Sequence, residues 1–220
     1  MKHFLDLILS FIFPINERER ALQIELKSIS STSLLKIAPS VLPLPNDEML
    51  SVLNYQNPQV KEIIWQLKYK SQKKYARLLA ECLYPSLIEE LSDKKLFENF
   101  TNPILVPIPL SKKRLRERGF NQTELIAREM SFIDEGKNFT VDTSVLYRIK
   151  DNEHQARIKD KRGRFENSKE TFAILDKNKV LKQNIILLDD VITSGATILS
   201  AQKELLDAGA RMVFMISIAH

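Results

Sequence analysis

The pattern of hydrophobic and polar positions in the last part of the chain predicts a strand, a helix and a second strand. Four apolar residues, 185–188, precede two aspartates, and such a run is typical of a strand buried on both faces of a parallel sheet. Apolar positions then recur at helical spacing over 198–206, and Gly209 suits the helix C-terminus. Residues 212–218 indicate another strand, so the segment forms a βαβ unit whose crossover should be right-handed.

The middle of the chain alternates helical and extended patterns in the same way. A helix is expected to begin at Asn57, which precedes a proline suited to the first helical turn. Residues 73–91 predict a second helix that Pro85 breaks or kinks. Residues 104–108 predict a strand, and Asn121 suits the N-cap of the helix after it. This order predicts an α/β fold with three layers, in which helices cover a parallel sheet.

Composition agrees with one sizeable core and a small appendage. The chain has 220 residues, of which 44% are hydrophobic. We expect a main domain at 55–220 and, at 1–54, a metal-free N-terminal helical or irregular subdomain, either an appendage or a hood. Residues Phe4–Phe13 are too few for a membrane span, which needs about 20 apolar residues. They predict an amphipathic helix packed on the main domain rather than membrane insertion, with a signal peptide or a surface anchor as the alternative.

The single cysteine bounds both the chemistry and the compartment. Cys82 cannot form a disulfide within one chain, which fits a reducing compartment, and we expect a cytoplasmic protein. It lies among leucines at helical spacing, so we interpret it as a core residue rather than a nucleophile. Because His3, His154 and His220 are far apart in sequence, no four-ligand zinc site with a recognisable spacing can be built.

An acidic pair and a small-residue loop carry the candidate chemistry. Asp189 and Asp190 stand at the carboxyl end of the predicted strand, where open α/β sheets bind ligands. Thr193–Thr197 then offers hydroxyls, backbone N–H groups and a glycine before a helix N-terminus, whose dipole favours an anion. Carboxylates suit sugar hydroxyls and the loop suits a phosphate, so the sequence predicts a ribose 5-phosphate site. An ordinary core strand that ends in a capped turn is the alternative interpretation.

The run Ile185–Thr197 resembles, along its whole length, the phosphoribosyl pyrophosphate (PRPP) loop of type I phosphoribosyltransferases. The resemblance implies a type I phosphoribosyltransferase-like fold, PRPP as substrate and Mg²⁺ as the cofactor that PRPP carries. It assigns the ribose hydroxyls to Asp189 and Asp190, and leaves open an indirect contact of this pair with the metal. In such an enzyme a nucleophile attacks C1 of the ribose and expels pyrophosphate through an oxocarbenium-like state, so the protein must hold the sugar and neutralise the leaving group. The loop residues expected to bind the 5-phosphate are Thr193, Ser194, Gly195, Ala196 and Thr197.

A second resemblance narrows the family. The segments Val106–Pro109 and Arg118–Gln122 look like the Val-Pro-x-Pro strand end and the Arg-Gly-Phe-Asn-Gln segment of the ComF competence family. That family commonly begins with a zinc ribbon made from two Cys-x-x-Cys pairs, which a chain with one cysteine cannot build. The resemblance implies a role in natural transformation, with single-stranded DNA and other competence proteins as partners. Further matching positions are Leu67, Lys68, Tyr69, Gln155, Arg164 and Asn167.

Two basic clusters flank the proposed site. The first, 112–118, lies between a strand end and a helix start, where type I transferases place the loop that meets the pyrophosphate. A solvated basic turn is its alternative interpretation. The second, 150–164, stands where the transferase fold has a mobile lid. The residues expected to face or close over the leaving group are Arg118, with less support Arg116, and the lid residues Gln155 and Arg164.

Two classes of function remain open at this point. The first is a Mg²⁺-dependent phosphoribosyltransferase with Asp189, Asp190 and Arg118 as catalytic residues. Its acceptor is unidentified, because Thr193 stands where transferases for 6-oxopurines carry an aspartate. The second is a PRPP-sensing module that handles single-stranded DNA without catalysis, which the net charge of +5 permits. We interpret Trp65 as a packing residue, with base stacking as the alternative.

Overall fold

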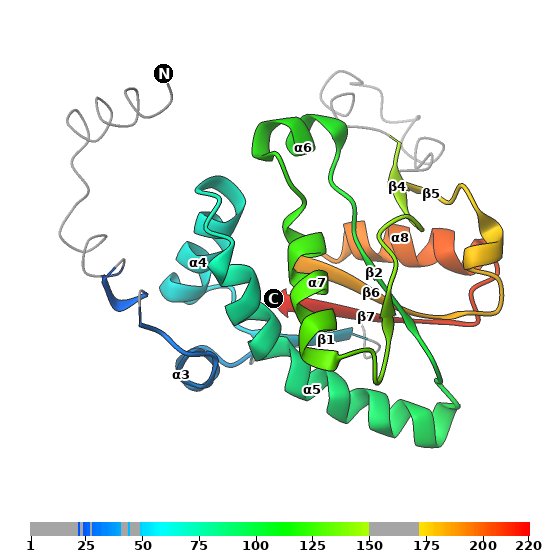
Figure 1. Cartoon of the computed structure of the whole chain (residues 1–220), viewed down its shortest axis with the longest axis horizontal. Coiled ribbons are helices and arrows are strands. Elements are labelled where there is room, and N and C mark those ends of the chain that lie inside the picture. Colours follow the sequence, from blue (N-terminus) through cyan, green and yellow to red (C-terminus); the bar gives the residue numbers. More distant parts are fainter. Residues whose placement is uncertain (1–21, 23, 27, 41–43, 45–48, 150–171) are drawn as a thin grey trace.

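A parallel sheet of five strands forms the centre of the molecule in the computed structural model (Figure 1). The structure describes residues 22, 24–26, 28–40, 44, 49–149 and 172–220. All pairings within this sheet are parallel. Its strands, in spatial order, are β1 (Met49–Leu53), β7 (Met212–Ala219), β6 (Asn184–Val191), β2 (Ile104–Pro107) and β3 (Thr140–Val141).

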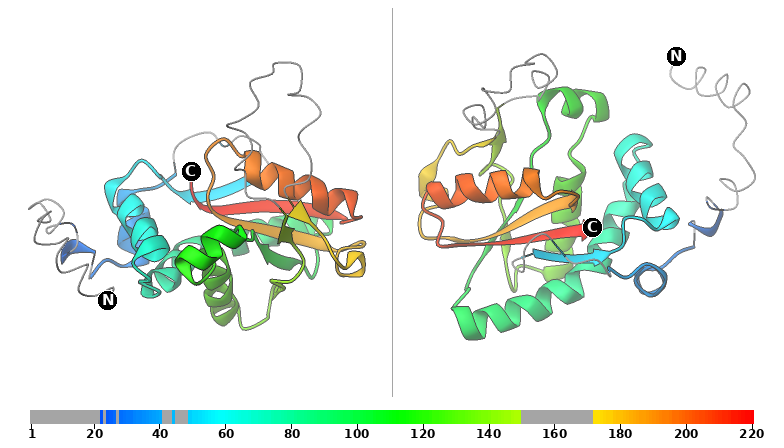
Figure 2. Two further views of the ribbon diagram at one scale, coloured as in Figure 1. Left: turned by 90° about the horizontal axis from the view of Figure 1, so that it is seen from above. Right: turned by 180° about the vertical axis from the view of Figure 1, so that it is seen from behind.

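Helices cover both faces of the sheet and give three layers (Figure 2). Helices α5 (Lys74–Glu98) and α7 (Gln122–Asp134) pack on one face, and α8 (Ala196–Asp207) packs on the other. Helix α4 (Pro58–Tyr69) packs on α5, beyond the carboxyl ends of the strands. The predicted fold class, a three-layer α/β fold with a parallel sheet, is therefore confirmed. The remaining elements are α3 (Ser31–Ile37), α6 (Lys112–Arg118), the 3-10 helix η1 (Lys177–Lys179) and the antiparallel pair β4 (Tyr147–Arg148) and β5 (Phe172–Ala173).

Local sequence signals explain where the predicted elements begin and end. The Asn57 side chain accepts hydrogen bonds from the N–H groups of Gln59 and Val60, so it caps α4 as predicted. Strand β6 is buried from Asn184 to Leu188, and its neighbour β7 is buried on both faces as well. Gly209 follows α8 with a φ of +94°, a left-handed conformation that a residue without a Cβ adopts at low cost.

The predicted interruption at Pro85 does not end the helix. Helix α5 continues through Pro85 to Glu98. A proline inside a helix removes one hydrogen bond and costs about 3 kcal/mol or more. Burial offsets this cost, because apolar side chains on both sides of the proline, including Leu83 and Leu87, are fully buried in the core.

The predicted boundary after residue 54 separates β1 from the sheet to which this strand belongs. Strand β1 lies within 1–54 and pairs with β7, with Met49 next to Met215 and Leu53 next to Ala219. Helix α3 also belongs to the main core, where Leu34 is fully buried. The physical reason is that β7 is apolar on both faces and needs a strand on each side to satisfy its backbone.

The basic segment 112–118 is a short helix, α6, rather than a loop. The Ser111 hydroxyl oxygen accepts from the N–H of Arg114 at the start, and Gly119 ends the helix with a φ of +78°. None of the residues of α6 is buried, and those at 112–117 are exposed. The sequence prediction missed this helix because it lacks an apolar face, which is the main periodic signal.

Other expectations meet the structure only in part. In the part of the chain that the structure describes, no helix is long and apolar enough to cross a membrane. The segment Phe4–Phe13 and the predicted lid at 150–164 lie outside the described residues.

Candidate functional site

Asp189 and Asp190 lie near the end of β6, and successive side chains of a strand point to opposite faces of a sheet. Asp190 faces α4 and α7, where its Oδ2 atom lies 2.6 Å from Lys68 Nζ and accepts from Gln122 Nε2 at 3.0 Å. Asp189 lines a hollow together with the loop that precedes α8. The two carboxylates therefore have different surroundings, one among polar side chains of the helices and one at the loop.

The loop after β6 leaves the N-terminus of α8 open. Gly195 is the N-cap residue with φ of 76° and ψ of −7° and has no side chain to cap the helix, while the Ser194 hydroxyl oxygen accepts from the N–H of Ala196 at 3.4 Å. The N–H groups of the first helical turn have no partners within the helix, and this turn contains no acidic residue. The positive end of the helix dipole and these donors suit a phosphate. The hollow has a volume of about 40 Å³, and its lining includes Asp189, Thr193, Ser194, Gly195, Ala196 and Thr197.

A network of side chains links three segments that are far apart in sequence. Arg118 Nη1 donates to Gln122 Oε1 at 2.8 Å, and Gln122 in turn donates to Asp190. Arg118 Nη2 donates to the hydroxyl of Tyr69 at 3.3 Å, and the guanidinium carbon lies 4.9 Å from the centroid of the Tyr69 ring. With Lys68 on Asp190, the network joins the end of α4, the α6–α7 segment and the end of β6. The structure thus brings Arg118 and Asp190 together through Gln122.

Asp189 has a perturbed titration. Burial and the neighbouring Asp190 carboxylate raise the pKa of Asp189 to about 7. The backbone N–H of Asp190, which donates to Asp189 Oδ1 at 2.8 Å, and the Lys68 ammonium act in the opposite direction. In the ligand-free protein this carboxyl group therefore loses its proton near neutral pH, and a ligand that supplies donors or positive charge would favour the ionised form.

The acidic pair offers two carboxylates that could contribute to a magnesium site. Within the described residues, no group of three or more His, Cys, Asp or Glu side chains could hold a metal ion. Mg²⁺ in phosphate-transfer sites keeps several waters and takes one or two carboxylates together with substrate phosphates. Asp189 is next to the open helix N-terminus and meets this requirement.

Burial raises the pKa of the Cys82 thiol to about 12, and this buried thiol is a core residue, as predicted.

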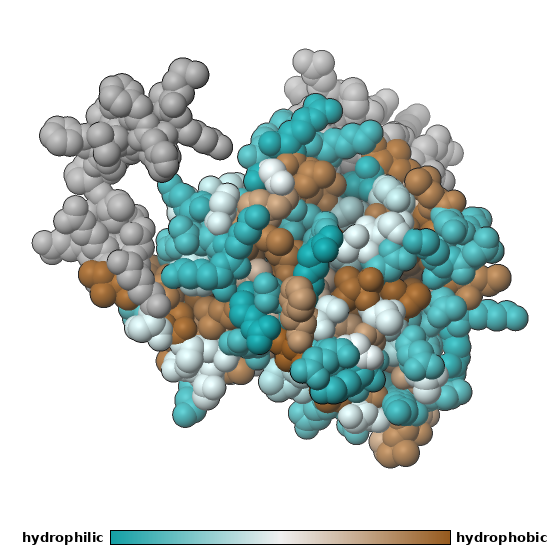
Figure 3. Space-filling view, in the orientation of Figure 1, coloured by the Kyte–Doolittle hydropathy of each residue, from teal (hydrophilic) through white to brown (hydrophobic). Residues whose placement is uncertain are grey.

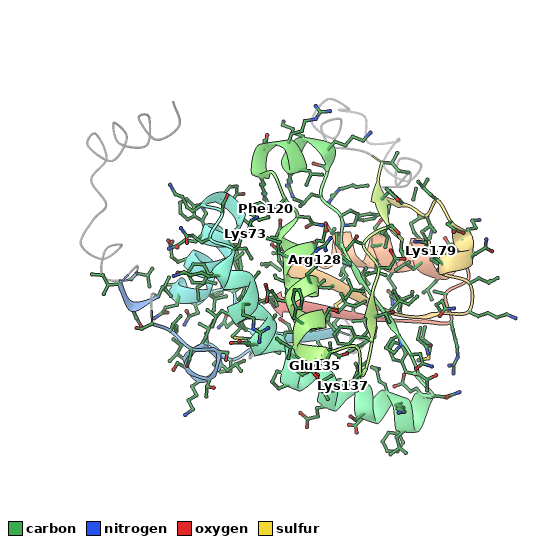
Figure 4. All side chains as sticks on the ribbon, in the orientation of Figure 1. Lys73, Phe120, Arg128, Glu135, Lys137 and Lys179 are labelled. Carbon is green, nitrogen blue, oxygen red and sulfur yellow. The ribbon has the colours of Figure 1, made fainter. Side chains whose placement is uncertain are left out.

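Exposed aromatic rings paired with basic side chains extend from the network. Trp65 and Tyr69 lie one turn apart on α4 with ring centroids separated by 6.1 Å, and they are 43% and 59% exposed. Lys70 Nζ lies 5.4 Å from the centroid of the Trp65 ring. Lys73 Nζ lies 5.9 Å from the centroid of the Phe120 ring, between the starts of α5 and α7 (Figure 4). Trp65 therefore packs beside Tyr69 and Lys70 at the surface of the molecule rather than in the core.

Several predicted residues fall outside the described part of the chain, and three described residues received no role from the sequence. Gln155 and Arg164 lie within 150–171, which the structure does not describe. Lys68, Tyr69 and Gln122 form the network with Asp190 and Arg118. The signal that could have found them was present, because all three belong to the segments that resemble the ComF family.

Comparison with known proteins finds relatives among competence proteins. The chain is 28% identical to Competence protein F of Haemophilus influenzae over 169 residues, which is 76% of this chain and 70% of that protein. It is 30% identical to Competence protein ComFC of Bacillus subtilis over 161 residues, which is 72% of this chain but only 58% of the length of that protein. It is 27% identical to the DNA utilization protein YhgH of Escherichia coli over 171 residues, or 78% of this chain and 71% of that protein.

Searches with family models and solved structures add less. No family model matches the chain. A hypoxanthine phosphoribosyltransferase of Staphylococcus aureus superposes with a TM-score of 0.35 at 9% identity, over 66% of this chain and 62% of that chain. An HGPRT-ase of Leishmania tarentolae in complex with GMP superposes with a TM-score of 0.36 at 14% identity, over 66% of this chain and 65% of that chain. Because these likenesses are remote, the sequence relatives carry the comparison, and they support a protein of the ComF competence family.

Proposed function

We propose that this protein binds PRPP together with Mg²⁺ at the carboxyl edge of its sheet and transfers the phosphoribosyl group to an acceptor during the handling of incoming DNA. The observation that carries the proposal is the pairing of an uncapped helix N-terminus at Gly195 with the adjacent Asp189 carboxylate. A phosphate on the helix and sugar hydroxyls on the carboxylate match the two ends of a ribose 5-phosphate. The relatives named as competence and DNA utilization proteins motivate the biological setting.

The residues of the chain would act by positioning and electrostatics. The first turn of α8 would hold the 5-phosphate, and Asp189 and Asp190 would accept hydrogen bonds from the ribose hydroxyls. When bound, Mg²⁺ supplies positive charge that offsets the charge of the diphosphate. The guanidinium of Arg118, which Tyr69 and Gln122 hold in place, would face the pyrophosphate as it departs with the electrons of the broken C1–O bond. The acceptor supplies the new bond to C1, so no nucleophile of the protein is needed.

Titration of the purified protein with PRPP and Mg²⁺ tests the proposal. We expect heat of binding in calorimetry and a rise in melting temperature, because a ligand that binds only the native state stabilises it. Asp189→Asn should weaken binding, whereas Asp207→Asn should not, because Asp207 ends the same helix at its far, exposed end. If the parent protein shows neither heat nor stabilisation at millimolar PRPP and Mg²⁺, the proposed site is wrong.

A second candidate function is a PRPP-sensing module that binds single-stranded DNA without catalysis. The exposed Trp65 ring beside Lys70 favours it, because bases of single strands stack on exposed rings beside positive charge. The surface around α6 is mainly hydrophilic in the space-filling view (Figure 3), and most of the residues of this helix are basic.

One experiment separates the two candidates. The chain has one tryptophan, so quenching of its fluorescence by an oligothymidylate reports contact at Trp65 directly. Release of pyrophosphate from PRPP, measured with and without the oligonucleotide and candidate bases, reports turnover. Quenching without pyrophosphate release would favour the sensing module, and release with any acceptor would favour the transferase.

A further inference from the structure

Lys68 forms an ion pair with Asp190, one of the two carboxylates proposed to bind the ribose. Its ammonium lies 2.6 Å from Asp190 Oδ2, and the exposed fractions of the two side chains are 17% and 8%. The same oxygen accepts a hydrogen bond from Gln122 at 3.0 Å. In the ligand-free protein, Asp190 is therefore already paired with a cation and an amide.

Ribose hydroxyls that compete for Asp190 Oδ2, the oxygen that Lys68 and Gln122 share, would disturb this pair. A partly buried ammonium that loses its carboxylate is costly unless another anion replaces it. Among the side chains of the network, Arg118 is a cation and Gln122 and Tyr69 are neutral, so none of them can take this role. Asp189 faces the α8 side of the sheet and is assigned to the same sugar. Within this network, the ligand is therefore the source of a replacement anion.

The geometry indicates which part of the ligand this is. The 5-phosphate is assigned to the N-terminus of α8, on the face of the sheet opposite to Lys68. Lys68 lies in the last turn of α4, on the same side as Arg118. Given the proposed function, on which this inference rests, we propose that Lys68 is a ligand-binding residue whose ammonium leaves Asp190 and pairs with the diphosphate of PRPP. The flexible stem of a lysine suits such a movement.

The test compares three ligands on three variants. PRPP, inorganic pyrophosphate and ribose 5-phosphate, each with Mg²⁺, are titrated into the parent and into Lys68→Met, Lys68→Arg and Lys61→Met. Lys61→Met is the matched control, because it removes the same charge from an exposed position two turns earlier on α4. We expect Lys68→Met to weaken PRPP and pyrophosphate at least tenfold and to leave ribose 5-phosphate unchanged or tighter. Lys68→Arg should retain most of the affinity for pyrophosphate, and Lys61→Met should retain all of it.

Two results would overturn the inference while leaving the proposed function standing. Unchanged PRPP affinity in Lys68→Met would show that Lys68 does not touch the ligand. An equal loss for ribose 5-phosphate would show that Lys68 only orients Asp190. If the parent itself fails to bind PRPP, the proposed function fails, and the inference fails with it.

A second variant keeps the test decisive if Lys68→Met does not fold. Asp190→Asn releases the ammonium from its carboxylate while keeping a side chain of the same shape. We expect this variant to bind pyrophosphate more tightly than the parent, because its lysine is already free to meet an anion. A weaker affinity for pyrophosphate in Asp190→Asn would refute the inference.

Discussion

Replacing Asp189 by asparagine should stabilise the ligand-free protein at pH 8 while weakening its binding of PRPP. Burial and the Asp190 charge raise the pKa of Asp189 from 3.8 to about 7 in the folded chain. Between these two values the folded state holds a proton that the unfolded state has released, so the free energy of unfolding falls as pH rises through this window. Asparagine keeps an oxygen that can accept from the N–H of Asp190 but carries no charge.

The size of the effect follows from the shift. One unit of pKa corresponds to about 1.4 kcal/mol, so the full shift costs the folded state about 4 kcal/mol above pH 7, of which roughly 2 to 3 kcal/mol accrues between pH 5 and pH 8. The coupling of Asp189 to Asp190 and Lys68 makes this an upper bound. The gain in unfolding free energy of Asp189→Asn over the parent should therefore be larger at pH 8 than at pH 5. We expect the gains at the two pH values to differ by at least about 1 kcal/mol.

Urea unfolding of both proteins at pH 5 and pH 8 measures the difference. Comparing the variant with the parent at each pH cancels the contributions of all other titrating groups. A stability difference that is the same at both pH values, or larger at pH 5, would contradict the reasoning and place Asp189 in a solvated environment. If the ligand-free variant is more stable but binds PRPP as well as the parent does, the raised pKa of Asp189 does not reflect a role in binding PRPP.

Three further predictions concern the loop, the fold and the basic surface. Gly195→Val should abolish binding of PRPP and cost about 1 to 2 kcal/mol of stability, because valine at a φ of 76° is strained; calorimetry and melting temperature check both effects. Asp134→Ala should lower the free energy of unfolding by about 2 to 4 kcal/mol in urea titrations, because this buried carboxylate accepts from Tyr84, from the backbone and side chain of Asn138 and from the N–H of Phe139. Charge reversal at Lys113 and Arg114 should flatten the salt dependence of oligonucleotide binding, whose slope is roughly 0.7 per neutralised phosphate; affinity indifferent to both changes would assign the basic surface of α6 no role in DNA binding.

The sequence by itself determined the features that depend on neighbouring residues. The apolar run before Asp189, the cap at Asn57 and the glycines at 195 and 209 were all found where the structure has them. Strand burial, helix caps and left-handed turns are decided by a few consecutive residues, so a pattern read along the chain contains them.

The tertiary structure alone decided which distant residues meet. No local pattern announces that Lys68 reaches Asp190 or that Tyr69 holds Arg118, because these contacts depend on how α4 packs on α5 beyond the end of β6. Packing also overrode local signals, since α5 continues through Pro85 where enough apolar surface is buried to offset the lost hydrogen bond. The candidate phosphate loop is local and could be predicted from the chain, whereas the charged side chains around the candidate site come from segments that only the fold brings together.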